Sequence, residues 1–182
     1  VFRKRTSEKS RIIPEPAETV LSEIKGPWNL AFQEGRGAPD QITLDSLSEW
    51  NINPDPGVKY FSGTCTYSKS IDVPQNWLDE GKGVWLDLGN VKNLAEVLLN
   101  GKSLGIIWKT PFRIEITEGL KAGSNDLEVK VTNLWVNRLI GDQQPGIEKK
   151  YTYTTMAFYK ADSPLLPSGL LGPVKILGLS DI

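Results

Sequence analysis

The chain has 182 residues, of which 39% are apolar and 24% charged, and its formal net charge is −1 at pH 7. These values are typical of one globular domain, and the balanced charge gives no electrostatic attraction to nucleic acid or an anionic membrane. No apolar run approaches the ~20 residues that a membrane-spanning helix needs. The absence of His excludes Ser-His-Asp catalysis, Cys-His catalysis and His metal ligands.

Residues 1–25 are interpreted as a lead-in or linker. They begin with a basic stretch that lacks an initiating Met and the apolar run of a signal peptide, which suggests a piece cut from a longer protein. The stretch 19–25 fits a helix and a strand equally well, and it is therefore a candidate first strand. We expect residues 26–182 to form a single domain.

Alternating apolar side chains then predict strands that are buried on one face. The first covers Trp28, Leu30 and Phe32, and a longer one is predicted from Lys59 to Val73. The inward positions of the longer strand are Phe61, Cys65, Tyr67, Ile71 and Val73, while the Ser and Thr residues between them face outward. Cys65 cannot form an internal disulfide, and its phase predicts a small core residue.

The stretch from Val84 to Arg138 organises the rest of the chain. Asn100-Gly101 lies between two apolar runs and predicts a hairpin, because both residues tolerate the positive φ of a type I′ turn. Two further runs alternate cleanly, which is typical of antiparallel strands with one buried face. Their inward residues are Phe112, Ile114 and Ile116 in one run, and Leu127, Val129 and Val131 in the other.

A Tyr/Thr-rich strand is predicted from Lys150 to Met156, and a closing strand from Leu170 to Leu179. One helical turn is expected from Asp45 to Trp50, where Ser46 and Glu49 have capping-box spacing. This makes nine or ten short strands with almost no helix. The fold class is therefore all-β, a β-sandwich of the jelly-roll type with mostly antiparallel strands.

The six Trp residues suggest sugar binding, because an indole presents a rigid apolar plate to the C–H face of a pyranose. The alternative for each Trp is core packing. Trp28 and Trp108 share the phase of apolar neighbours and are predicted to lie in the core. Trp50, at a loop edge, and Trp85, in phase with Asp87, are better candidates for a platform.

The densest polar cluster follows the strand that contains Leu127: it runs from Asn133 to Arg138 and includes Trp135, Asn137 and, further on, Asp142. Asn, Arg and Asp supply donors and acceptors for pairs of hydroxyl groups, as sugar recognition requires. Equally, Asn137 and Arg138 would simply cap the strand end and pair with a carboxylate of the next loop. Both interpretations stay open on the sequence alone.

Two other motifs do not support catalysis or nucleotide binding. A glycosidase needs two carboxylates across one sugar, and nothing in the sequence pairs Asp87, Glu96, Asp142 or Glu148. Gly101-Lys102-Ser103 resembles the end of a phosphate-binding loop, but Glu96 stands where the loop requires its first Gly. We therefore expect no complete active site in this chain.

Several motifs together resemble a known domain type. They are Y-F-S-G-T-C-T-Y at 60–67, L-D-L-G at 86–89, A-E-V-L-L-N-G-K at 95–102, W-K-T-P-F at 108–112, V-T-N-L-W-V-N-R-L-I-G-D at 131–142 and S-G-L-L-G-P-V at 168–174. The chain resembles the C-terminal β-sandwich of α-L-rhamnosidase-like enzymes of glycoside hydrolase family 106. It also looks like the galactose-binding-like jelly roll of family 2 glycosidases.

The resemblance implies a bacterial glycoside hydrolase whose catalytic carboxylates belong to a separate barrel domain. It favours Asn137, Arg138 and Asp142 as substrate-binding positions, and our prediction adds Trp135 and Trp50. Jelly rolls of this type often hold a structural calcium, although no cluster of oxygen ligands stands out here, and no other cofactor is expected. The implied localisation of the parent protein is periplasmic or secreted.

Two hypotheses follow. In the first, the chain is a non-catalytic, sugar-binding-like accessory domain that lends loop residues to the parent active site. In the second, it is purely structural, docks on the catalytic barrel and binds no sugar. The expected partners are therefore a carbohydrate and the catalytic barrel, with neither nucleic acid nor a membrane. Whether the Asn137–Asp142 segment lies in an open cleft or on an apolar face distinguishes the two hypotheses.

Overall fold

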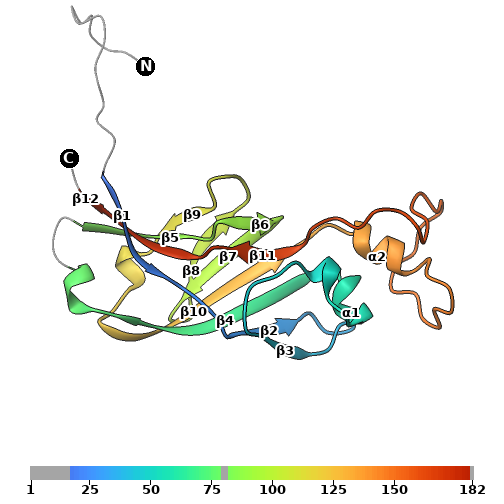
Figure 1. Cartoon of the computed structure of the whole chain (residues 1–182), viewed down its shortest axis with the longest axis horizontal. Helices are drawn as coiled ribbons and strands as arrows, with labels where there is room; N and C mark the ends of the chain where they lie inside the picture. The colour runs from blue at the N-terminus through green and yellow to red at the C-terminus, as the bar shows by residue number, and fades with distance from the viewer. Residues whose placement is uncertain (1–16, 79–81, 181–182) are drawn as a thin grey trace, which may run out of the picture.

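The computed structural model describes residues 17–78 and 82–180 of the chain. Within them, two antiparallel sheets stack face to face as a β-sandwich, which confirms the predicted fold class (Figure 1). The predicted linker at residues 1–16, part of the turn predicted at 74–83 and the last two residues lie outside this description.

The larger sheet has six strands in the order β3-β2-β4-β10-β7-β8. In that order they are β3 (Gln41–Leu44), β2 (Trp28–Phe32), β4 (Thr64–Val73), β10 (Gly123–Thr132), β7 (Leu94–Leu99) and β8 (Lys102–Ile107). β4 and β10 pair along their whole length at the centre of the sheet. The predicted hairpin at Asn100-Gly101 joins β7 to β8, and both residues have positive φ, 51° and 78°.

The second sheet has four strands in the order β1-β12-β5-β9, and a two-stranded ladder lies beside it. The four are β1 (Glu18–Glu23), β12 (Lys175–Ser180), β5 (Lys82–Asp87) and β9 (Arg113–Glu115), and the ladder pairs β11 (Gly169–Gly172) with β6 (Asn90–Lys92). The candidate first strand is thus β1, which pairs with β12 as an edge of the sandwich.

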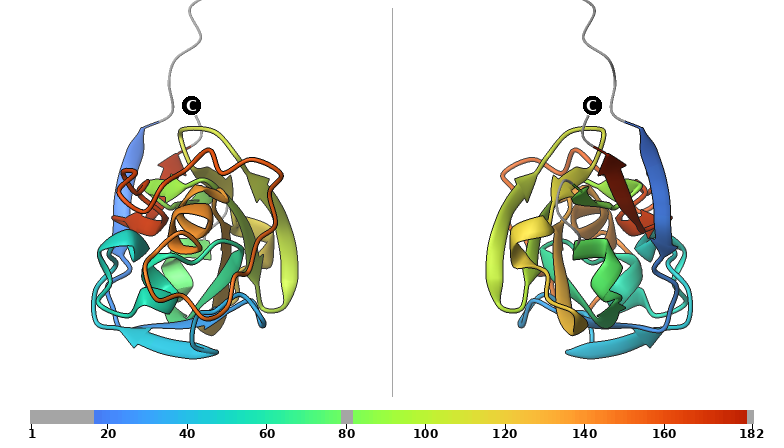
Figure 2. Two further views of the ribbon diagram at one scale, coloured as in Figure 1. Left: turned by 90° about the vertical axis from the view of Figure 1, so that its right-hand side faces the viewer. Right: turned by 90° about the vertical axis from the view of Figure 1, so that its left-hand side faces the viewer.

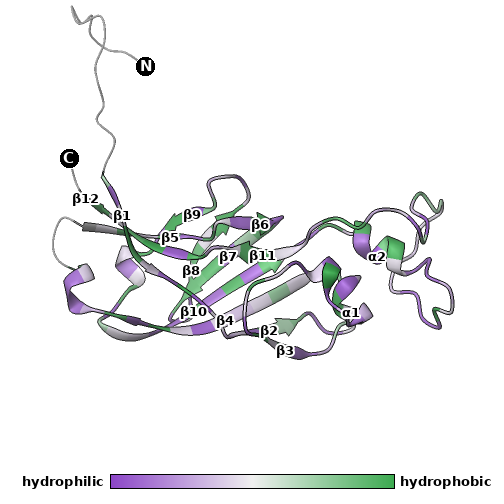
Figure 3. Ribbon diagram, viewed as in Figure 1, coloured by the Kyte–Doolittle hydropathy of each residue, from purple (hydrophilic) through white to green (hydrophobic). Residues whose placement is uncertain are grey.

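The core lies between the sheets, and the predicted alternation places it correctly. Trp28, Leu30 and Phe32 of β2 are buried while the residues between them are exposed. Leu127, Val129 and Val131 of β10 are likewise buried, and Figure 3 shows apolar and polar bands along β10. Burial of this apolar face is the main favourable contribution to folding.

Four local predictions are wrong. The long strand begins at Thr64 rather than Lys59, because Asp55 accepts a hydrogen bond from Gly57 N (2.7 Å) and caps a helix, α1 (Pro56–Lys59). The helical turn expected at Asp45–Trp50 lies instead at Trp50–Ile52. The strand predicted at 150–156 does not form, and the last predicted strand is split at Pro173 into β11 and β12.

The remaining helical segments are short turns at Gln75–Leu78 and Thr117–Gly119, and the helix α2 (Val136–Gly141). α2 lies across the end of the sandwich that is opposite to the start of β1 and the end of β12 (Figure 1; Figure 2, left). The segment 142–168, here called the α2 loop, projects from that end. No helix in the described ranges is long and apolar enough to span a membrane.

Candidate functional site

The end of β10 is fastened to the chain that leads into β4. Asn133 donates to Phe61 O (2.9 Å) and accepts from Gly63 N (3.0 Å) through its one side-chain amide. Ser62, predicted to face outward, is buried and donates to Leu134 O (2.8 Å). These contacts join segments about seventy residues apart, and they set the position from which α2 begins.

Asn137 of α2 forms a second paired amide. Its Nδ2 donates to Leu166 O and its Oδ1 accepts from Leu166 N, both at 2.8 Å. The side chain is 2% exposed, so it has no free face for a ligand. A two-way pair of this kind satisfies one backbone donor and one acceptor at once, which holds the far end of the α2 loop against the helix.

Arg138 and Asp142 lie one helical turn apart and form an ion pair that is almost fully buried. Nε of Arg138 is 3.0 Å from Oδ1 of Asp142, although the N–H is not aligned for a hydrogen bond, and the side chains are 6% and 1% exposed. Oδ2 of Asp142 accepts from Tyr151 N (3.0 Å), Thr152 N (2.8 Å) and Thr152 Oγ1 (2.6 Å). Asp142 therefore fastens the near half of the α2 loop.

Three predicted binding residues thus act inside the domain. The side chains of Asn137 and Asp142 form hydrogen bonds with residues of the α2 loop, and Arg138 pairs with the carboxylate of Asp142. This is the alternative in which the cluster caps the strand end and pairs with a loop carboxylate. A substrate-binding role for these three residues stays a prediction. Among the described residues, the terminal nitrogens of Arg138 donate no hydrogen bond, and Arg138 Nε and Asp142 Oδ1 are joined only by the ion pair.

The Trp residues correct two expectations. Trp50 is 1% exposed, and its Nε1 donates to the hydroxyl of Tyr67 (2.7 Å) inside an aromatic cluster, so it is not a platform. Trp108 is 71% exposed, because β8 ends one residue before it. Trp28 is in the core as predicted, and Trp135 is 57% exposed with the Arg36 guanidinium 5.7 Å from its ring centre.

The α2 loop exposes large apolar side chains that sequence reasoning missed. Tyr153, Met156 and Phe158 are 88%, 75% and 80% exposed, and Leu134 and Trp135 are exposed at the start of α2. Figure 3 shows apolar stretches on α2 and on the loop beyond it. The signal was present in the run Y-T-Y-T-T-M-A-F-Y, whose first part was predicted to be a Tyr/Thr-rich strand from Lys150 to Met156.

Three of the candidate carboxylates, Asp87, Glu96 and Asp142, each have their own partners inside the domain. Asp87 accepts from Arg113 Nε (2.7 Å) and from Gly89 N (2.8 Å), and Glu96 accepts from Ser103. The hydrogen bond to Asp87 is the main reason why the pKa of Arg113 is raised above its ordinary value. Among the described residues, no group of three or more His, Cys, Asp or Glu side chains is placed to hold a metal ion, and the structural calcium stays a prediction.

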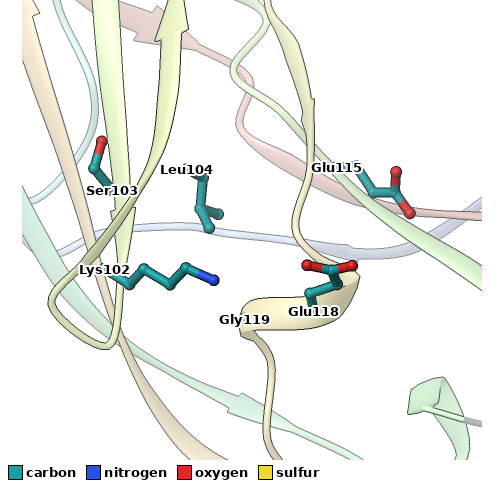
Figure 4. A pocket seen from close by; sticks show the side chains of 6 residues that line it. All are labelled: Lys102, Ser103, Leu104, Glu115, Glu118 and Gly119. Carbon is teal, nitrogen blue, oxygen red and sulfur yellow. The ribbon is translucent and has the colours of Figure 1, made fainter.

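A shallow hollow of about 350 Å³ lies between β8 and the turn at Thr117–Gly119 (Figure 4). Lys102 extends across it toward Glu118, whereas Glu115 points away. All three side chains are exposed, and none of the residues predicted to bind a sugar lines the hollow. The predicted site residues instead gather at the α2 end.

Comparison with known proteins agrees with this architecture. Residues 49–162 match the family described as glycosyl hydrolase 2 galactose-binding domain-like. The chain belongs to this family. The match includes α1, the whole six-stranded sheet except β2 and β3, α2 and most of the α2 loop.

Its relatives are bacterial glycoside hydrolases. The chain is 45% identical to a rhamnosidase from Novosphingobium sp. PP1Y, with a TM-score of 0.89 over 97% of the chain. It is 39% identical, over 84% of its length, to a putative beta-glucuronidase of Formosa agariphila. A beta-D-glucuronidase from Dictyoglomus thermophilum, 20% identical with a TM-score of 0.62 over 93% of the chain, shares the fold. The chain spans only 17%, 15% and 29% of these proteins, respectively.

Proposed function

We propose that this chain is a non-catalytic accessory domain of a bacterial glycoside hydrolase of the α-L-rhamnosidase type, family 106, and that its α2 end docks on the rest of that enzyme. The similarity to a rhamnosidase over nearly the whole chain supports the parent class. The engagement of Asp87, Glu96 and Asp142 by other side chains of the domain supports a non-catalytic role.

One observation carries the docking role. The polar groups of Asn137 and Asp142 are consumed inside the domain, while the loop that they hold exposes Tyr153, Met156 and Phe158. Aromatic residues and Met are enriched in the buried centres of protein interfaces, and their exposure together on one segment is typical of a contact surface. The hydrogen bonds that Asn137 and Asp142 form with the α2 loop therefore hold this exposed segment in a fixed conformation.

The test compares the chain alone with the parent enzyme. In the parent, Phe158→Ser and Met156→Ser should lower the Tm and the rhamnosidase activity, because they remove apolar contacts between domains. In the chain alone, the same changes should leave the Tm unchanged, since both side chains are exposed. Val20→Ser is the matched control, because Val20 is 56% exposed on β1, away from α2. A parent enzyme that tolerates both loop changes as well as it tolerates Val20→Ser would contradict docking.

A second function, weak sugar binding, is favoured by the exposed ring of Trp135. Titration of the chain with rhamnose, galactose and pectin-type oligosaccharides, followed by Trp fluorescence, tests it, and Trp135→Phe identifies the responding residue. The chain alone should not hydrolyse an aryl rhamnoside, and turnover would overturn the non-catalytic role. We further propose that the parent protein is periplasmic or secreted, which cell fractionation tests.

A further inference from the structure

Arg138 has more hydrogen-bond donors than the domain satisfies. A guanidinium carries five N–H donors, and only Nε faces a carboxylate, that of Asp142. Nη1 and Nη2 donate no hydrogen bond to any residue in the described ranges. The side chain is 6% exposed and Nε is enclosed, so the remaining opening to solvent lies away from Nε.

Two aromatic rings hold the guanidinium in place. Its central carbon lies 5.0 Å from the ring centre of Tyr151 and 5.9 Å from that of Tyr60. These two rings come from different segments of the chain: Tyr60 follows α1, and Tyr151 belongs to the α2 loop, where its N–H donates to Asp142. An arginine held this way is preorganised, and little side-chain entropy is lost when its terminal nitrogens meet an acceptor.

Two lysine side chains lie near the same two rings. Lys149 Nζ lies 5.0 Å from the ring centre of Tyr151, and Lys59 Nζ lies 5.6 Å from that of Tyr60. Three cations therefore surround two tyrosines, and Asp142 is the carboxylate that contacts Arg138. The excess positive charge creates a local potential that attracts an anion.

The planar guanidinium of Arg138 favours one kind of anion. Gly141 leaves room for the guanidinium, since a Cβ there would lie 2.3 Å from Nη2. Among the described residues, Nε is the guanidinium atom of Arg138 that is buried without a hydrogen bond, so Nη1 and Nη2 reach the surface and can meet an acceptor from outside. The fork of an arginine matches two oxygens in one plane. A carboxylate supplies two such oxygens and a neutralising charge.

We propose that the terminal nitrogens of Arg138, flanked by Lys149 and Lys59, bind a carboxylate that the described part of the chain does not supply. Two sources share this chemistry: a free sugar acid, or an Asp or Glu side chain from the rest of the parent enzyme. The second source rests on the docking proposed above, whereas the first does not.

The first arm of the test uses the chain alone. Nitrogen-15 NMR of the arginine side chains follows Arg138 during titration with galacturonate, with galactose as the uncharged control and acetate as the minimal carboxylate. If the source is a sugar acid, galacturonate should shift the Arg138 signals with at least about tenfold higher affinity than galactose, as expected for a charge-assisted pair. Arg138→Lys assigns the signals and should abolish the selectivity.

Lys149→Ala guards against a folding defect, because Lys149 is exposed and its Nζ lies over the ring of Tyr151 rather than inside the core. It should weaken galacturonate binding about two- to fivefold and leave the Tm unchanged, since it removes one flanking charge. Arg138 signals that stay unchanged at high galacturonate would exclude the free-acid source.

The second arm uses the parent enzyme without added sugar. If an acidic side chain supplies the carboxylate, the Arg138 signals should differ between the chain alone and the parent, and Arg138→Lys should lower the Tm of the parent more than that of the chain. A failure of docking alone would leave the first arm intact. Arg138 signals that respond neither to galacturonate or acetate nor to the parent enzyme would overturn the proposal.

Discussion

Asn137 and Leu166 exchange two hydrogen bonds of 2.8 Å, one in each direction, across 29 residues of chain. The amide of Asn137 thus replaces a partner strand for a segment that has none. We expect Asn137→Ala to lower the free energy of unfolding by about 1–3 kcal/mol, because it removes both partners of the part-buried Leu166 N–H and C=O. Urea denaturation of the chain measures this loss.

Asn29→Ala is the matched control for that change. Asn29 is exposed on β2 and makes one long side-chain contact, at 3.2 Å, with Thr43. Its replacement should change the free energy of unfolding by less than about 0.5 kcal/mol. Equal effects of the two substitutions would contradict a fastening role for Asn137.

Removal of the Asp142 charge should affect stability and the α2 loop together. We expect Asp142→Asn to cost about 3–5 kcal/mol, because it leaves the buried Arg138 charge unpaired. Hydrogen exchange should accelerate at the amides of Tyr151 and Thr152, which donate to Asp142 in the native protein. The double variant Arg138→Met, Asp142→Leu should recover part of the lost stability, and a strictly additive loss would argue against direct coupling.

The stability changes expected for Trp50 and Trp108 substitutions are the reverse of those that the sequence predicted, with Trp50 as a platform and Trp108 in the core. Trp50→Phe should destabilise the chain by about 1–3 kcal/mol, because it leaves a void in the aromatic cluster and removes the hydrogen bond to Tyr67. Trp108→Phe should change the stability by less than about 0.5 kcal/mol, since its side chain is exposed. Thermal denaturation followed by circular dichroism separates the two.

Burial raises the pKa of the Cys65 thiol above its ordinary value, so the folded state keeps the thiol protonated. Stability from this group is complete below the pKa of the unfolded thiol, about 8.5, and declines as the pH rises above it, by at most about 1.4 kcal/mol per pH unit. Urea denaturation at pH 8 to 10 should show this decline, and Cys65→Ala should reduce it. A native thiol that reacts as fast as a free cysteine would contradict the burial.

Strands β2, β4, β7 and β10 of the six-stranded sheet were predictable because buried residues recur at every second position along most of their length. Leu127, Val129 and Val131 alternate with polar residues, and only one orientation of β10 buries all three. The turn at Asn100-Gly101 was equally readable, since its positive φ values favour those two residue types. Such signals are local, so they can be read without knowledge of the rest of the chain.

The site was only half predictable. The sequence showed that polar residues gather after β10, but their direction depends on partners that lie far away in the chain. Asn133 meets Phe61 and Asn137 meets Leu166, so the amides face inward. The α2 loop misled the prediction for the same reason: its aromatic run has strand-like composition but no neighbouring strand to pair with.

The sequence by itself determined that the chain is an all-β sandwich with its core between two sheets, because side chains alternate across a strand whatever their long-range contacts. Only the tertiary structure decided which side of the Asn137–Asp142 corner faces solvent. Hydrogen bonds across tens of residues turn Asn137 and Asp142 inward, and the same bonds leave the aromatic side chains of the α2 loop exposed.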